Sequence, residues 1–244
     1  MKKTAEIGLN RTGVQMAPSM TKRMIEASEA LPFKEVNHDA VLAPMESLRR
    51  TFIEHADPVG TVPVPGTMKG TVSTGAQVLK GNDPTIFLDK LGERLAFERS
   101  GVRLYDSFIA KARVLAPDMN VSRLMEIRAE EAQHFAMLRE CIESLGADPT
   151  AQTPAADNVG VQSMGLVQSM NDPRTNIEQA INTLHVAELV DVDGWELLIR
   201  LAEEAGQDAM VIKFTEANRK EAQHLADVRR WHDELLLKKK DVQH

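Results

Sequence analysis

The tetrapeptide Glu-Ala-Gln-His occurs twice in the sequence, at Glu131–His134 and again ninety residues later at Glu221–His224. Each copy follows a glutamate that lies thirty-three residues earlier in an apolar stretch, Glu98 in the first half and Glu188 in the second. The same offset pairs the intervening apolar positions without a gap. Two copies of one structural unit are therefore expected, and a fold must accommodate both.

Periodic apolar positions predict four long helices, over about 85–115, 121–145, 174–205 and 209–239. Asp-Pro pairs precede the first and third helices, and Gly146 and Gly206 follow the second and third. A few residues join the members of each consecutive pair, whereas more than twenty residues separate the second helix from the third. Short links produce antiparallel hairpins, and a long link lets the chain return along a bundle. We therefore predict an all-α four-helix bundle of two repeated hairpins joined by a long crossover.

The first 82 residues differ in character from the remainder. Six prolines interrupt them, and the stretch 58–75 is rich in proline, glycine, threonine and valine, which favours extended backbone. Short helices are expected around 21–30 and 43–55. The predicted organisation is an irregular N-terminal arm over 1–82, extended with short helices, followed by the helical bundle over 83–244.

Ionisable side chains occupy positions in the apolar stripes of all four predicted helices. Glu98 lies in the stripe between Leu95 and Val102, and Glu188 takes the matching place in the third helix. The two Glu-x-x-His pairs lie in the same way within the stripes of the second and fourth helices. Six ionisable groups are thus expected to face the core: Glu98, Glu131, His134, Glu188, Glu221 and His224.

Such a cluster predicts bound metal. A buried carboxylate costs several kcal/mol unless it is paired or bound to a cation, and two divalent cations would balance four carboxylate charges. The i, i+3 spacing within each Glu-x-x-His pair places an oxygen and a nitrogen ligand on one helix face. Mixed oxygen and nitrogen ligation suits iron or manganese. We expect two metal ions, iron first, with manganese or a mixed iron–manganese pair as the alternative.

This pattern resembles the ferritin-like di-iron carboxylate superfamily, and within it the rubrerythrin-like proteins. The resemblance covers about 83–240 and implies a ferritin-like four-helix bundle whose metal ligands are the six residues above. Tyr105 stands seven residues after Glu98, which matches that family's spacing. Two departures are clear. Rubrerythrins carry a four-cysteine rubredoxin module, whereas Cys141 is the single cysteine here, and their extra glutamate on the third helix is replaced by Asp191.

Several neighbours of the six residues are candidates for a supporting role. His185 and Asp191 are possible additional ligands or hydrogen-bond partners of ligands. Tyr105 is a candidate catalytic residue, through a hydroxyl hydrogen bond to a ligating carboxylate. We expect Trp195 to pack in the core. We expect Cys141 to be a buried, inert thiol. Solvated helix faces are the simplest interpretation of four further acids: Glu93, Glu126, Glu130 and Glu216.

The first functional hypothesis is an oxidoreductase in which a two-metal centre, most simply di-iron, reacts with hydrogen peroxide or dioxygen. Its electron donor is unknown, because the sequence holds no second redox module. A second hypothesis is a ferroxidase that stores or delivers iron, and a third is a non-enzymatic metal-binding scaffold. Oxidation of an organic substrate is a fourth, which requires a cavity beside the site.

The composition limits which binding partners and which cellular location we expect. The net charge is -7, and the one concentrated basic run is Lys238–Lys240, so nucleic acid is not expected as a partner. No apolar stretch of eighteen residues occurs, so a membrane span is not expected. The N-terminus lacks the apolar run of a secretory signal, which favours a cytoplasmic protein. The long arm favours a homo-oligomer, with a dimer preferred.

Overall fold

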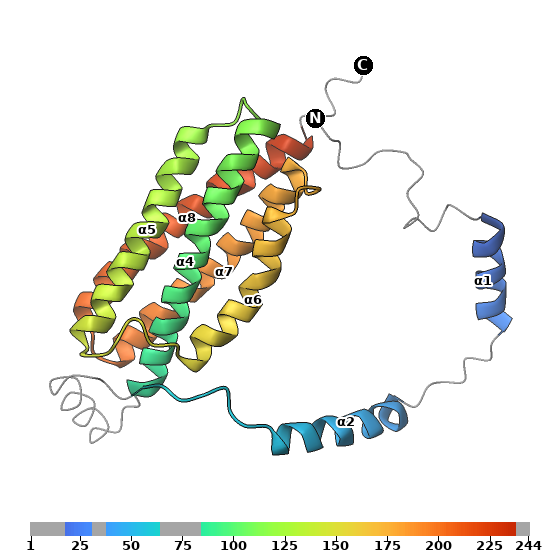
Figure 1. Ribbon diagram of the computed structural model, residues 1–244, viewed down its shortest axis with the longest axis horizontal. Helices are drawn as coiled ribbons and strands as arrows, with labels where there is room; N and C mark the ends of the chain where they lie inside the picture. The colour runs from blue at the N-terminus through green and yellow to red at the C-terminus, as the bar shows by residue number, and fades with distance from the viewer. Residues whose placement is uncertain (1–17, 31–37, 64–83, 238–244) are drawn as a thin grey trace. The chain divides into compact units, whose positions relative to one another are not determined.

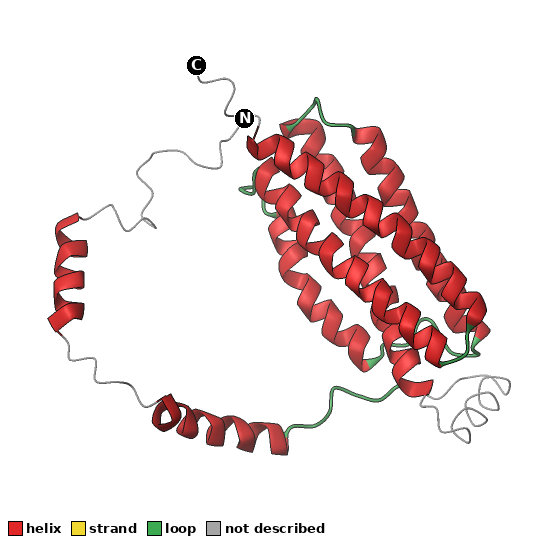
Figure 2. Cartoon of the chain, turned by 180° about the vertical axis from the view of Figure 1, so that it is seen from behind, coloured by secondary structure: helices red, strands yellow, loops and turns green. Residues whose placement is uncertain are grey.

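The structure, a computed structural model, describes residues 18–30, 38–63 and 84–237, and its regular structure within those ranges is helical without a strand (Figure 2). The all-α prediction is therefore confirmed. The helices are α1 (Pro18–Ala30), α2 (His38–His55), α4 (Pro84–Leu115), α5 (Val121–Ser144), α6 (Pro154–Asn171), α7 (Ile177–Glu204) and α8 (Asp208–Leu237). None of these described helices combines the length and apolarity that crossing a membrane requires.

Contacts divide the chain into two units, one with α1 and α2 and the other with α4 to α8. Helices α1 and α2 coincide with the short helices expected around 21–30 and 43–55. Most of the stretch 58–75, together with Lys238–Lys240, lies outside the described residues. The division between an arm and a bundle at residue 82 also falls outside them and stays a prediction.

The bundle consists of two hairpins, α4 with α5 and α7 with α8, and α4 also packs against α7 (Figure 1). Asn120 caps α5 by accepting a hydrogen bond from the backbone N–H of Arg123, and Asn176 caps α7 in a capping box with Gln179. Gly146 and Gly206 end α5 and α7 with φ of 82° and 65°. This left-handed conformation carries little steric cost for glycine, so both predicted helix ends are confirmed.

The crossover contains a helix that the sequence analysis did not predict. Helix α6 follows α4 along its length and packs against both α4 and α7 (Figure 1). Thr153 caps it, with Pro154 in its first turn, and its buried side chains recur at helical spacing, at Ala156, Val159, Ser163 and Met170. Gly160 and Gly165 lie within this helix; each glycine costs a helix only about 1 kcal/mol, which burial of the apolar face outweighs.

Two apolar clusters fill the interior and lie on either side of the predicted ionisable residues. One includes Tyr105, Phe108, Leu124, Ile181 and Val228. The other includes Leu91, Leu95, Leu138, Trp195 and Phe214. On α5, α7 and α8 the ionisable positions fall in sequence between the members of the two clusters, and on α4 Glu98 lies between Leu95 and Leu104. We call this stratum the acidic layer; it comprises Glu98, Glu131, His134, Glu188, Asp191, Glu221 and His224.

Alanine substitutions at two glycines, one on α4 and one on α6, should change the free energy of unfolding in opposite directions. A methyl group at Gly92 of α4 would lie 2.6 Å from Thr153 Oγ1, whereas one at Gly160 of α6 would meet no atom within 4 Å. We expect Gly92→Ala to lower the free energy of unfolding by about 1–3 kcal/mol through overpacking. Gly160→Ala should raise it by about 0.5–1 kcal/mol. Urea denaturation measures both, and equal shifts in the two variants would contradict this packing.

Candidate metal centre

All six predicted ligands point into the bundle and are almost completely buried, each at most 4% exposed. They come from the four long helices, with Glu98 on α4 and Glu188 on α7, while α5 and α8 each supply a glutamate and the histidine three residues later. The position of each side chain follows from helical geometry, because residues three apart project from nearly the same side. The structure therefore brings together the six residues that the repeat singled out.

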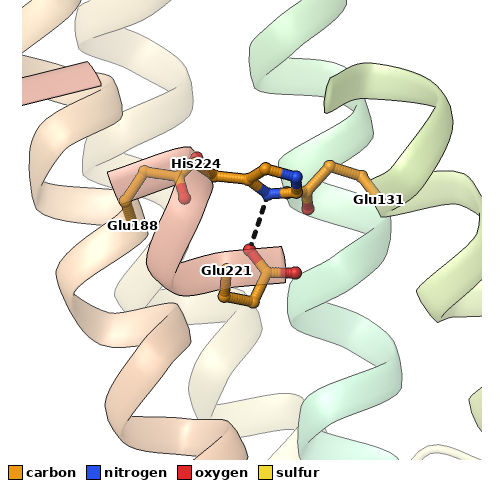
Figure 3. Close-up of side chains that lie close together, drawn as sticks. All are labelled: Glu131, Glu188, Glu221 and His224. Atoms are coloured by element: carbon orange, nitrogen blue, oxygen red, sulfur yellow. Dashed lines mark hydrogen bonds and ion pairs between the residues drawn. The ribbon is translucent and has the colours of Figure 1, made fainter. Parts of the chain in front are cut away.

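Three overlapping groups of ligand atoms could each hold a cation, with the atoms of each group within 4.8 Å of one another. Figure 3 shows the first group, which we call the His224 set: Glu131, Glu188, Glu221 and His224. The second, the His134 set, comprises Glu98, His134 and Glu221, and the third contains Glu98, Glu131, Asp191 and Glu221. Glu221 belongs to all three groups, so the geometry provides for adjacent cations with a shared carboxylate.

The two histidines direct their Nδ1 atoms toward Glu221. His134 Nδ1 lies 2.5 Å from Glu221 Oε1. His224 Nδ1 lies 2.9 Å from Glu221 Oε2, the contact that Figure 3 marks with a dashed line. His224 Nδ1 is also 3.4 Å from Glu131 Oε1. On the other side of the ring, His224 Nε2 is 2.9 Å from Glu130 Oε2. This outer carboxylate orients the imidazole so that Nδ1 faces the acidic layer, as is usual for metal-binding histidines.

Tyr105 donates a short hydrogen bond from its hydroxyl to Glu188 Oε1. The hydroxyl was expected to contact a carboxylate of the site, and the structure shows it doing so across the bundle, from α4 to α7. Burial, followed by the charge of Glu188, raises the pKa of Tyr105 well above its ordinary value. The phenol therefore remains a donor at neutral pH and orients Glu188. A catalytic role for Tyr105 stays a prediction.

Burial raises the pKa of Glu98, Glu188 and Asp191 well above their ordinary values, and neighbouring carboxylates raise it further. At Glu221, burial also acts upward, but hydrogen bonds from both histidines outweigh it and bring the pKa to about 2. Burial lowers the pKa of His224, whereas its hydrogen bonds to Glu131 and Glu221 raise it to about 12 overall. Protons on several groups thus compensate charge wherever no cation is bound.

One further observation supports metal binding by these residues. Within the described part of the chain, Glu98, Glu131 and Glu188 each have one buried carboxylate oxygen, Oε2, without a hydrogen-bond partner. Oxygens buried in this way cost free energy that hydrogen bonds normally offset. Glu131 approaches α4 at Gly101, where a methyl group would overlap Glu131 Oε2. A helix-interior glycine is unfavourable by itself, and here it leaves space for a carboxylate.

His185, a possible additional ligand or hydrogen-bond partner of a ligand, does not belong to these three groups. Its ring is partly exposed and lies against His232, with ring centroids 5.6 Å apart, and Arg229 Nε is 3.4 Å from its Nε2. Both Arg229 and His232 belong to α8, so His185 contacts that helix, whereas Glu188, three residues later, lies in the acidic layer.

Glu130 and Arg94 are site residues that the sequence analysis missed. Glu130 was interpreted as a solvated acid, but it accepts from His224 and forms ion pairs with Arg123 and Lys220. Arg94 is buried and pairs with Glu98 and Asp191. A signal for Arg94 existed, because it stands one turn before Glu98 and between two core leucines. Glu130 offered no such signal, since its partner lies on another helix.

The remaining expectations for this region concern packing and surface acids. Trp195 is a core residue whose ring meets His134 edge-on, with centroids 5.6 Å apart. Cys141 is buried, and burial raises the pKa of its thiol, as expected for an inert cysteine. Glu126 and Glu216 are exposed and pair with arginines on their own helices. Glu93 is partly exposed and pairs with Lys90.

Comparison with known proteins adds no argument about this chain. No family model matches the chain, and no curated protein matches it either. A similar solved structure is described as ferritin like, diiron-carboxylate proteins from Bacillus anthracis str. Ames. The two chains are 17% identical with a TM-score of 0.49, over 60% of this chain and 94% of that one. At these values the similarity carries no inference about the function of this chain.

The charge state of the acidic layer predicts how metal-free protein responds to pH. Between the ordinary carboxyl value of 4.5 and the raised pKa of Glu98 and Glu188, the folded state holds protons that the unfolded state has lost. His224 has the same effect above 6.5, up to about 12. The free energy of unfolding of chelator-treated protein should therefore fall as pH rises from 5.5 to 8.5, by about 1.4 kcal/mol per pH unit for each such proton.

Thermal unfolding across that pH range tests this expectation. Glu221 does not alter this trend. Its lowered pKa stabilises the folded state, and this contribution no longer changes with pH above the ordinary carboxyl value of 4.5. Glu126→Gln, which removes an exposed acid on α5, serves as the control and should keep the wild-type slope. A melting temperature that stays constant or rises would show that the layer is not holding these protons.

Proposed function

We propose that this chain binds two metal ions in the acidic layer, most simply iron, and acts on dioxygen or hydrogen peroxide as an oxidoreductase. The observation that carries the proposal is the convergence of the three ligand groups, with buried carboxylate oxygens that lack hydrogen-bond partners in the described residues. Five carboxylates in one buried layer need more positive charge than the nearby side chains provide. Two divalent cations would supply it, and the oxygen and nitrogen donors suit iron or manganese.

Each set of residues has a distinct part in this proposal. The residues of the His224 set would hold one ion and those of the His134 set would hold the other, and Glu221 is a member of both sets. Glu130 fixes the ring of His224 through Nε2, and Tyr105 fixes Glu188. Such supporting contacts typically change metal affinity 10–100-fold when they are removed. The site is therefore oriented by side chains as well as by the helices.

An iron pair would supply redox equivalents and Lewis acidity toward bound dioxygen or peroxide. The chain supplies the surroundings for that chemistry. The two apolar clusters above and below the layer exclude bulk water. Tyr105 keeps its proton next to Glu188, where it can donate a hydrogen bond. We propose another protein or a small reductant as the electron donor, because the one cysteine of this sequence, Cys141, is buried.

Metal analysis of single variants tests the ligand assignment. We expect about two ions per chain in protein loaded with ferrous iron, as the inventory of four glutamates and two histidines implies. Glu131→Ala and Glu221→Ala should each lose one or both ions, because each residue belongs to more than one ligand group. Glu126→Ala and Glu216→Ala remove exposed acids from the same helices and should retain full occupancy. Full occupancy in both ligand variants would refute the assignment.

Reaction of the ferrous protein with oxidant tests the proposed activity. Under anaerobic conditions, addition of hydrogen peroxide should oxidise the bound iron within the mixing time of a manual assay, followed by ultraviolet–visible absorption or Mössbauer spectroscopy. Addition of a reductant should return it to the ferrous form. A centre that stays ferrous under both peroxide and air would favour the metal-binding scaffold instead. Uptake of many irons per chain after oxidation would favour the ferroxidase and storage alternative.

A further inference from the structure

A buried arginine is built into one side of the acidic layer. Arg94 of α4 is 5% exposed. Its Nε lies 3.1 Å from Glu98 Oε1, and its Nη2 lies 3.1 Å from Asp191 Oδ1. Its Nη1 donates to the backbone oxygen of Asp191 at 3.3 Å. One guanidinium therefore engages carboxylates from α4 and α7 at once, with the fork geometry that an arginine offers and a lysine does not.

The surroundings hold this guanidinium in place. Its central carbon lies 4.4 Å from the centroid of the Phe97 ring and 5.9 Å from that of Trp195. On the α7 side it rests against Gly194, where a methyl group would overlap Nη1. Cation–π contacts favour a charged group over these rings, and the glycine provides the necessary space. Arg94 is thus a fixed positive charge.

The positive charge of Arg94 contacts a carboxylate of the His134 set and none of the His224 set. Arg94 contacts Glu98, which belongs to the His134 set, and Asp191, which belongs to the third group. Neither carboxylate is part of the His224 set. The ninety-residue offset pairs Arg94 with Leu184 and Asp191 with Gly101, so the sequence places no corresponding ion pair beside the His224 set. Within the layer the two halves therefore differ by the Arg94–Asp191 pair, while Glu130 contacts His224 from outside the layer.

We propose that Arg94 is a positioning residue that makes the two metal positions unequal, so that the His224 set fills first and the His134 set binds its ion more weakly. The inference rests on the proposed function and extends it. Arg94 acts in two ways: it competes for an oxygen of Glu98 and it repels an incoming cation. In a buried site, even at an effective dielectric constant of about 20, a unit charge several ångströms from a divalent ion alters its affinity by more than tenfold.

Titration of the metal-free full chain with Co²⁺, which is stable to air, tests the inference through binding alone. Calorimetry gives the two dissociation constants, and the visible spectrum of Co²⁺ reports the coordination of each ion. Wild type should bind two ions in separate steps. Arg94→Leu, which introduces the residue found at the paired position 184, should tighten the weaker step by about tenfold or more, by the electrostatic reasoning above. The tighter step should change much less.

Two control variants separate charge from packing. Arg94→Lys retains the positive charge and should keep the second ion weak. Arg103→Leu removes an exposed arginine from the same helix and should match wild type in both steps. Circular dichroism establishes that each variant is folded. Should Arg94→Leu fail to fold, the wild-type and Arg94→Lys titrations still decide the matter, because each must show a weak second step.

The possible results are distinct. Two equal steps in wild type, a tight second step in Arg94→Lys, or an unchanged second step in folded Arg94→Leu would each overturn the inference about Arg94. Those results would leave the two-metal proposal standing, because two ions would still bind. Failure of every variant, wild type included, to bind Co²⁺ would instead refute the two-metal proposal itself.

Discussion

The structure depends on compensation of the carboxylates buried in the middle of the bundle. Five acids lie in the acidic layer, and each is at most 3% exposed. Left alone, such charges would cost several kcal/mol each. Here Arg94 pairs with two of them, both histidines contact Glu221, and burial raises the pKa of Glu98 and Glu188, which favours their protonated forms. In the proposed function, a pair of divalent cations would supply this compensation in place of the protons.

This requirement explains several features of the surrounding structure. Glycines stand where a carboxylate or a guanidinium approaches a helix closely, at Gly101 beside Glu131 and at Gly194 beside Arg94. Trp195 meets His134 edge-on and belongs to the apolar cluster next to the layer. Helix α6 packs on α4 and α7. The same contacts that hold the bundle together therefore also hold the acidic layer in position.

Much of the fold could be predicted because the signals are local. Periodic apolar residues, Asp-Pro pairs and terminal glycines located the four long helices within a few residues of their observed bounds, with the third beginning at Ile177 instead of about 174. Helix α6 was missed because Gly160 and Gly165 resemble a loop, although both lie on a helix whose opposite face is buried. Its stability comes from packing against α4 and α7, which no local pattern encodes.

The sequence by itself determined which way the six predicted side chains project from their own helices, since an i, i+3 spacing fixes direction about a single axis. Only the tertiary structure decided which groups from different helices meet. It paired Arg94 with Asp191 and Glu130 with His224, and it turned His185 toward His232. These outcomes follow from the rotation and offset of one helix against the next, which the packing of the whole core sets.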